Sequence, residues 1–204
     1  MLAFWKKVVS KCEGGQKVFI AFVAANTAHS PGTTGAKLLV AEDGEIFGTI
    51  GGGLMEFNII AHAKEALKTG EFEPEIQMLH HRKSGNGEQS GMICAGSQTN
   101  LYYLCEPERD LQVVKITAEL VEFDKTGVLY ISKTGIAVQE NEPDIDVPQI
   151  QLDVKDEKEW LYKEQLLNFK RIAIIGGGHC ALALSRVMKQ LGYEVFVFET
   201  RENV

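Results

Sequence analysis

The apolar residues in the first half of the chain follow two different periods. Residues 17–25 contain the continuous run Val-Phe-Ile-Ala-Phe-Val-Ala-Ala, whose length is typical of a strand buried on both faces. Further along, apolar positions recur at helical spacing until Thr69-Gly70 ends the pattern, at Met55, Ile59, Ala63, Ala66 and Leu67. We therefore predict a buried strand at 17–25 and an amphipathic helix at 54–67.

The other segments up to residue 140 show the same two patterns. Asp43-Gly44 separates two β-prone stretches, and this dipeptide favours a tight hairpin because both turn positions need a positive φ. The remaining expected elements are helices at 2–12 and 109–123, strands at 76–82 and 100–105, and a second hairpin at 128–139. This mixture predicts an α+β domain over residues 1–140.

A different order of elements begins after residue 170. An apolar strand at 171–175 runs directly into three glycines, and a helical pattern then precedes a second strand at 194–199. The segment Gly176-x-Gly178-x-x-Ala181 after a strand is the dinucleotide fingerprint in its alanine variant. Residues 170–204 are therefore expected to begin a Rossmann-like parallel sheet, which places the whole chain in the α/β class.

The fingerprint assigns a physical role to each of its residues. Gly176 makes the tight turn, Gly178 lets a pyrophosphate approach the backbone, and His179 at the helix start can touch a bound phosphate. Glu199, at the end of the second strand, can meet a ribose hydroxyl. NAD(P) is thus a candidate cofactor, and an NAD(P)-dependent oxidoreductase is the alternative function, although the same turn also serves as a structural crossover.

Two parallel strands and one helix leave an apolar sheet edge open. From this we expect either the front part of a longer polypeptide or a homo-oligomer that completes its sheet through a second copy. In the second case the apolar strand at 194–199 would pair with its counterpart.

Acidic residues are concentrated between the two regions. Residues 140–159 hold eight acidic residues and only two lysines, together with Pro143 and Pro148. We interpret 141–169 as a solvated acidic linker that joins a domain at 1–140 to the unit at 170–204.

Charge and cysteine usage exclude several classes of protein. The net charge of −7 and the lack of a basic segment argue against a nucleic-acid partner, and no apolar run approaches the roughly 18 residues of a membrane span. The N-terminus lacks the order of charges of a signal peptide, so a cytoplasmic location is expected. The four cysteines form no C-x-x-C pair, which favours reduced thiols.

Two glycine-rich loops carry the most informative residues. Residues 29–37 read His-Ser-Pro-Gly-Thr-Thr-Gly-Ala-Lys, and residues 48–56 read Gly-Thr-Ile-Gly-Gly-Gly-Leu-Met-Glu. Gly51, Gly52 and Gly53 stand immediately before a helix, so its first N–H groups and positive dipole end can hold an anion. A packing turn is the structural alternative, and Glu56 either caps the helix or contacts a ligand's amino groups.

A third glycine-rich stretch, at 83–97, contains Cys94. A cysteine between small residues can present its sulfur to a ligand, whereas Cys12, Cys105 and Cys180 stand in apolar patterns typical of a core. We expect Cys94 and the Gly51–Gly53 loop to converge, because both follow strands of one domain.

Together these segments resemble the XdhC/CoxI family, the accessory proteins of xanthine dehydrogenase. The resemblance rests on the two loops above, on Gly-Met-Ile-Cys-Ala-Gly at 91–96 and on Ile-Ile-Gly-Gly-Gly-His-Cys at 174–180. The chain departs from the family where Ala95 replaces the first glycine after the cysteine and where Gly32 replaces an arginine.

The resemblance implies a chaperone for the molybdenum cofactor (molybdopterin) rather than a catalyst. Such a protein binds the cofactor, supports its sulfuration and passes it to xanthine dehydrogenase or a related molybdenum hydroxylase, with a cysteine desulfurase as a further partner. The implied cofactor-binding residues are Ser30, Gly35, Lys37, Gly51, Gly52, Gly53, Glu56, Cys94, Gly96, Gly176, Gly178 and His179. Cys94 is also the candidate molybdenum ligand, since thiolate is a soft donor.

Overall fold

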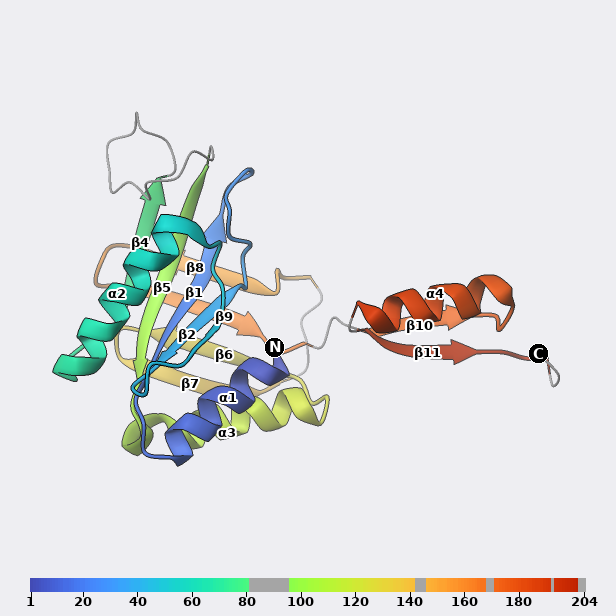
Figure 1. The fold of residues 1–204 in the computed structure, drawn as a ribbon, viewed down its shortest axis with the longest axis horizontal. Coiled ribbons are helices and arrows are strands. Elements are labelled where there is room, and N and C mark those ends of the chain that lie inside the picture. Colours follow the sequence, from blue (N-terminus) through green and yellow to red (C-terminus); the bar gives the residue numbers. More distant parts are fainter. Residues whose placement is uncertain (81–95, 142–145, 168–170, 192, 202–204) are drawn as a thin grey trace. The chain divides into compact units, whose positions relative to one another are not determined.

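The computed structural model divides the chain into two units, Met1–Leu167 and Asn168–Val204, each of which is considered by itself. It describes residues 1–80, 96–141, 146–167, 171–191 and 193–201 (Figure 1). None of the helices within these ranges is long and apolar enough to cross a membrane.

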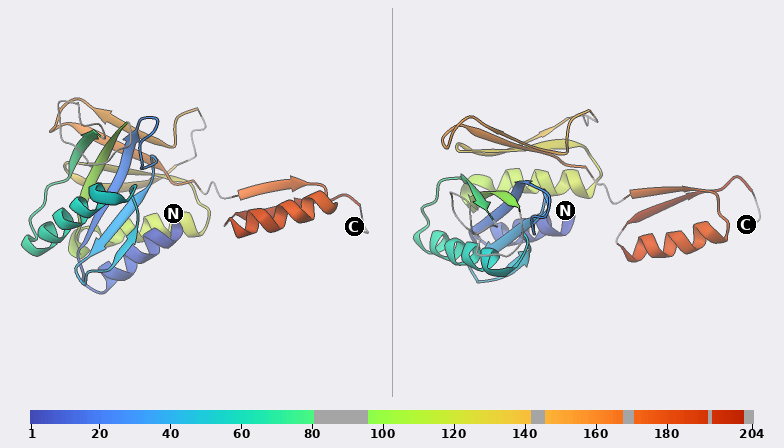
Figure 2. Two further views of the ribbon diagram at one scale, coloured as in Figure 1. Left: turned by 45° about the horizontal axis from the view of Figure 1, so that its top comes forward. Right: turned by 90° about the horizontal axis from the view of Figure 1, so that it is seen from above.

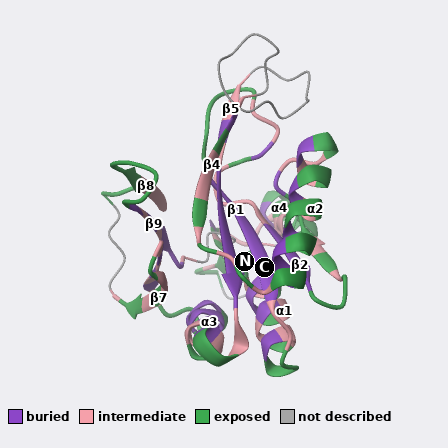
Figure 3. Cartoon of the chain, turned by 90° about the vertical axis from the view of Figure 1, so that its left-hand side faces the viewer, coloured by how far each residue is buried: buried purple, intermediate pink, exposed green. Residues whose placement is uncertain are grey.

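A five-stranded antiparallel sheet, in the order β3-β2-β1-β5-β4, forms the centre of the first unit. Its strands are β1 (Val18–Asn26), β2 (Lys37–Ala41), β3 (Ile46–Gly48), β4 (Glu75–His80) and β5 (Ser97–Cys105). The predicted buried strand is confirmed, because β1 is the middle strand and all but its last two residues are buried (Figure 3). The hairpin around Asp43-Gly44 is confirmed as well, with β2 and β3 antiparallel.

The described residues of this unit form the helices α1 (Leu2–Glu13), α2 (Gly53–Thr69) and α3 (Pro107–Glu122). The side chains that α2 buries are the five predicted from the helical spacing, and they pack against Phe19, Ala21 and Val23 of β1. Gly70 ends α2 in a left-handed conformation, as the Thr69-Gly70 signal predicted. The opposite face of the sheet contributes Ile20 and Phe22 to a second core cluster that includes residues of α1 and α3.

A second antiparallel sheet, in the order β7-β6-β9-β8, lies on the side of the first sheet opposite α2 (Figure 2). It consists of β6 (Gly127–Ser132), β7 (Gly135–Glu140), β8 (Ile150–Val154) and β9 (Trp160–Gln165). The prediction of a linker at 141–169 was therefore wrong for both β8 and β9. These strands fold because Trp160 and Tyr162 alternate inward along β9 and join the core cluster of α1 and β1.

A buried ion pair connects the two sheets. The Nζ atom of Lys37, at the start of β2, lies 2.7 Å from Oε1 of Glu164 on β9, and their side chains are 7% and 1% exposed. The Tyr162 hydroxyl donates to Glu164 Oε2 at 3.0 Å, and Lys37 Nζ donates to the carbonyl of Gly35 at 3.0 Å. The Glu164 carboxylate, within the expected linker 141–169, thus lies inside the first unit, where it neutralises the buried Lys37.

The second unit is a β-α-β unit of β10 (Arg171–Ile175), α4 (His179–Gln190) and β11 (Glu194–Phe198). The two strands are parallel, as predicted, and Arg171 pairs with Glu194. The expected apolar surface is present, because Ile175 is 83% exposed and Phe198 is 57% exposed. Cys180 was wrongly predicted to lie in a core, since the residue that α4 buries against the strands is Ala181 and Cys180 is exposed.

Removal of Glu164 alone should destabilise the first unit strongly. Glu164→Leu leaves the Lys37 ammonium buried without a counter-charge, which should lower the free energy of unfolding by about 3–5 kcal/mol. The double variant Lys37→Met/Glu164→Leu should regain most of that loss. Urea unfolding followed by tryptophan fluorescence measures this, because Trp5 and Trp160 are both buried in the first unit. A double variant no more stable than Glu164→Leu would show that the unpaired charge of Lys37 is not the cause of the loss.

Candidate functional site

Three loops gather at one end of the five-stranded sheet: residues 27–36 after β1, 49–52 after β3, and 96 before β5. Glycines make their close approach possible. A Cβ on Gly96, whose φ is +150°, would lie 3.0 Å from the Ser30 nitrogen, and one on Gly51 would lie 2.8 Å from the Gly32 nitrogen. Gly96, Ser30 and Gly51 therefore belong to one loop cluster.

The side-chain amide of Gln98 joins these loops and is completely buried. Its Oε1 atom accepts hydrogen bonds from the Gly32 nitrogen and the Ser30 hydroxyl, both at 3.1 Å. Its Nε2 atom donates to the Ile50 carbonyl at 3.0 Å and to Asn100 Oδ1 at 2.7 Å. One residue of β5 thus fixes the position of the loop after β1 relative to the loop after β3.

The polar network continues along β5. Asn100 Nδ2 donates to the Tyr102 hydroxyl at 3.2 Å, and that hydroxyl donates to Gln77 Oε1 at 2.9 Å. Gln98 and Asn100 were not among the site residues predicted from the sequence. The signal was present, because two polar residues at a spacing of two within a buried strand share one face and must find partners there.

Glu56 caps its own helix instead of being free for a ligand. Its Oε2 atom accepts hydrogen bonds from the Ile50 nitrogen at 2.8 Å, the Gly52 nitrogen at 3.1 Å and the Thr49 hydroxyl at 2.6 Å. These include N–H groups of the turn that we expected to bind an anion. A carboxylate of the protein itself therefore takes that place, which favours the capping alternative.

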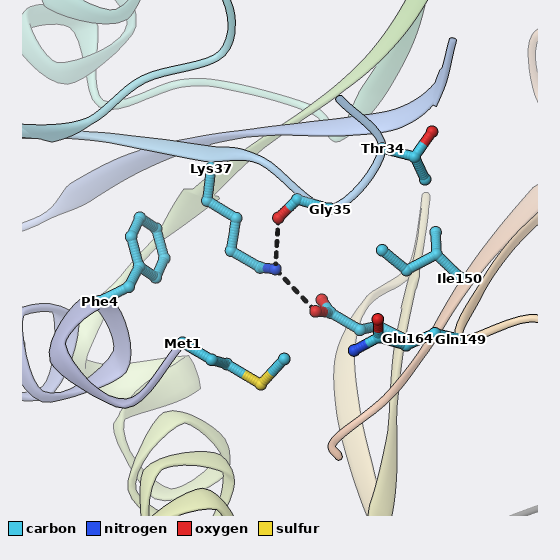
Figure 4. Close-up of a pocket in the computed structure, with 8 residues that line it drawn as sticks. All are labelled: Met1, Phe4, Thr34, Gly35, Lys37, Gln149, Ile150 and Glu164. Carbon is cyan, nitrogen blue, oxygen red and sulfur yellow. Dashed lines mark hydrogen bonds and ion pairs between the residues drawn. The ribbon is translucent and has the colours of Figure 1, made fainter. Parts of the chain in front are cut away.

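Lys37 and Gly35 lie at a separate cavity of about 340 Å³ (Figure 4). Its lining residues are Met1, Phe4, Thr34, Gly35, Lys37, Gln149, Ile150 and Glu164. Lys37 was predicted to bind a cofactor, but its ammonium group is already paired with Glu164. The loop at 29–37 thus contributes Ser30 to the Gln98 cluster and Gly35 and Lys37 to this cavity.

Cys94 lies outside the described residues, so its convergence with the Gly51–Gly53 loop stays a prediction. In the sequence it precedes Gly96 by two residues, and Gly96 does contact the loop at 28–30.

The glycine turn of the second unit is also closed by a carboxylate. The Gly177 nitrogen donates to Oε2 of Glu199 at 2.6 Å, and Arg201 Nη2 lies 2.7 Å from the same atom. The Arg201 guanidinium, with further help from backbone N–H donors, holds the pKa of the Glu199 carboxyl well below its usual range. Gly176, which was expected to make the tight turn, has a φ of +100°, while ligand contacts of Gly178 and His179 stay predictions.

The first unit matches a known family over the region that contains both glycine-rich loops. Residues 12–80 match the XdhC and CoxI family. This confirms the resemblance inferred from the two loops at 29–37 and 48–56, whereas the motifs at 91–96 and 174–180 lie outside the matched residues. The matched region includes Ser30, Lys37 and Glu56, whereas Gln98 and Cys94 follow it in the chain.

Individual proteins are also similar to this chain. The uncharacterized protein YqeB of Escherichia coli (strain K12) is 35% identical over 82 residues, which are 38% of this chain and 14% of that protein. A crystal structure of a xanthine dehydrogenase from Bacillus halodurans has a TM-score of 0.61 with 17% identity, over 98% of this chain and 63% of the other. The second similarity shows a common fold, and this chain spans less than two thirds of either protein.

Loss of the Glu56 carboxylate should open the turn before α2. Glu56→Ala leaves the Ile50 and Gly52 nitrogens without their acceptor, so the free energy of unfolding should fall by about 1–3 kcal/mol. Glu65→Ala, an exposed carboxylate on the same helix, is the matched control and should change it by less than about 0.5 kcal/mol. Equal effects of the two substitutions in urea unfolding would contradict the capping role.

His62 on α2 should report on its contact with β4. Its Nε2 atom lies 3.3 Å from Glu75 Oε1, and this hydrogen bond raises the pKa of His62 above its ordinary value of 6.5. The resulting stabilisation is fully present below pH 6.5 and is lost as the pH rises through the higher pKa of the folded state. NMR titration should show a raised pKa that falls in Glu75→Gln, and an unchanged value in that variant would contradict the contact.

Proposed function

We propose that this protein is an accessory factor that binds the molybdenum cofactor and passes it to xanthine dehydrogenase or a related molybdenum hydroxylase. The observation that carries the proposal is the match of residues 12–80 to the XdhC and CoxI family. That region supplies two of the three loops that gather around Gln98. The third loop contributes Gly96, which follows Cys94 by two residues in the sequence. The common fold with the Bacillus halodurans protein adds support.

The loop cluster fits the phosphate of the cofactor only in part. Glu56 already occupies the N–H groups of Ile50 and Gly52. The N–H groups of Gly53 and Leu54, in the first turn of α2, have no partner within the helix, and both residues are exposed. These two groups, at the positive end of the helix dipole, would hold the phosphate.

The remaining contacts would come from the other two loops. When bound, the cofactor would supply a redox-active molybdenum centre. The protein would hold the cofactor and shield it from solvent before transfer. Cys94 would offer a soft sulfur ligand to the metal. Glycine at position 96 keeps the backbone there close to Ser30, because a Cβ at this position would lie only 3.0 Å from the Ser30 nitrogen.

The proposal predicts that Cys94 is needed to retain the metal. Cys94→Ser replaces a soft donor with a hard one of similar size, so molybdenum retained on purification should fall about tenfold or more. Cys180→Ser, which changes an exposed cysteine of the second unit, is the matched control and should retain as much as the parent protein. Molybdenum is measured by mass spectrometry, and the pterin by fluorescence after oxidation.

One result would contradict the function, and another would contradict the role of Cys94. A parent protein that carries neither pterin nor molybdenum from cells that make the cofactor, and that fails to activate cofactor-free xanthine dehydrogenase, would argue against the function. Equal retention by Cys94→Ser and Cys180→Ser would leave the function possible but remove Cys94 from the site.

A further inference from the structure

The cavity beside Lys37 has the size and walls of a small-molecule site. Its volume of about 340 Å³ lies within the range of roughly 300–1,000 Å³ found for ligand pockets. Phe4, Met1 and Ile150 contribute apolar walls, and Thr34 and Gln149 contribute polar ones. All of these residues belong to the first unit, so the cavity is formed within one folded body.

The polar part of the cavity is the ion pair of Lys37 and Glu164. Both side chains are more than nine-tenths buried, and their charges cancel. A charged ligand would be buried there without a counter-charge, which is costly, so the cavity favours a neutral one.

The ion pair also has hydrogen-bonding capacity to spare. An ammonium group has three N–H donors, and Lys37 directs two of them at Gly35 and Glu164. Each oxygen of Glu164 accepts one hydrogen bond, from Lys37 or from Tyr162, and can accept another. A ligand in the cavity therefore meets a donor and an acceptor side by side.

We propose that this cavity binds a flat, neutral heterocycle through a lactam edge. The ring carbonyl would accept a hydrogen bond from Lys37, and the adjacent ring N–H would donate one to Glu164. In Figure 4 the ion pair lies between Phe4 and Ile150, whose apolar side chains would contact the ring. Two parallel hydrogen bonds to a buried pair select strongly for this edge, because a ring without it would leave the donor and the acceptor unpaired.

Pterins and oxopurines both carry a lactam edge on a fused ring of this size. For a pterin, the inference rests on the proposed function, because the molybdenum cofactor contains one. The ring would then lie in this cavity, while the phosphate is held at the start of α2. For an oxopurine, the inference does not depend on the proposed function. Titration with a pterin and with an oxopurine distinguishes the two ligands.

The test is calorimetric titration of the purified chain with pterin, hypoxanthine and 1-methylhypoxanthine. The methyl group removes the lactam N–H and keeps the ring, so 1-methylhypoxanthine should bind at least tenfold more weakly than hypoxanthine. Tighter binding of pterin would identify the cofactor ring as the ligand, and tighter binding of hypoxanthine would identify an oxopurine. No binding of either ring, or equal binding of hypoxanthine and its methyl derivative, would overturn the proposal.

Variants place the binding in this cavity. Ile150→Phe adds volume at the cavity wall while Lys37 and Glu164 are kept, and it should weaken binding at least tenfold. Val154→Phe, on the same strand, exposed and outside the cavity lining, is the matched control and should bind like the parent. Lys37→Met/Glu164→Leu keeps the charge balance and should lose binding, while unfolding curves confirm that each variant is folded.

The outcomes separate this inference from the proposed function. Ring binding that survives in Ile150→Phe and in the double variant would place the ligand elsewhere and overturn the inference, whatever the molybdenum content. A protein that purifies without molybdenum and still binds hypoxanthine at this cavity would contradict the proposed function and support the inference.

Discussion

The candidate site depends on the buried side-chain amide of Gln98. Its oxygen accepts from the loop after β1 and its nitrogen donates to the loop after β3, so one side chain satisfies polar groups of two segments far apart in sequence. A buried amide without hydrogen-bond partners destabilises the folded state. The two loops therefore have to stay in the positions that satisfy both atoms of the Gln98 amide. The glycines at 32, 51 and 96 are needed because the loops approach each other more closely than a Cβ allows.

Three carboxylates bind groups that a ligand was expected to bind. Glu56 accepts from the backbone of the glycine turn before α2, Glu164 neutralises Lys37, and Glu199 accepts from the glycine turn before α4. The described residues therefore satisfy most of the predicted anion sites from within the protein. Two kinds of group remain available among these residues: exposed N–H groups at the start of α2, and the remaining donor and acceptor positions of the Lys37–Glu164 pair, whose charges cancel.

Local pattern predicted much of the fold. The five buried positions of α2, the middle strand β1 and the parallel β-α-β unit follow from spacing and turn residues alone. The errors arose where a polar residue is buried because it has a distant partner. Glu164 belongs to a segment whose charge suggested a solvated linker, and only the three-dimensional position of Lys37 explains its burial. Likewise, Glu56 could be assigned to capping or to ligand binding only once the turn geometry was known.

Binding of the cofactor at the loop cluster around Gln98 can be measured by hydrogen–deuterium exchange of the protein with and without isolated molybdenum cofactor. We expect slower exchange on cofactor binding in peptides that cover residues 28–32, 49–54 and 96–98. Protection confined to residues 171–201, around the glycine turn of the second unit, would contradict it.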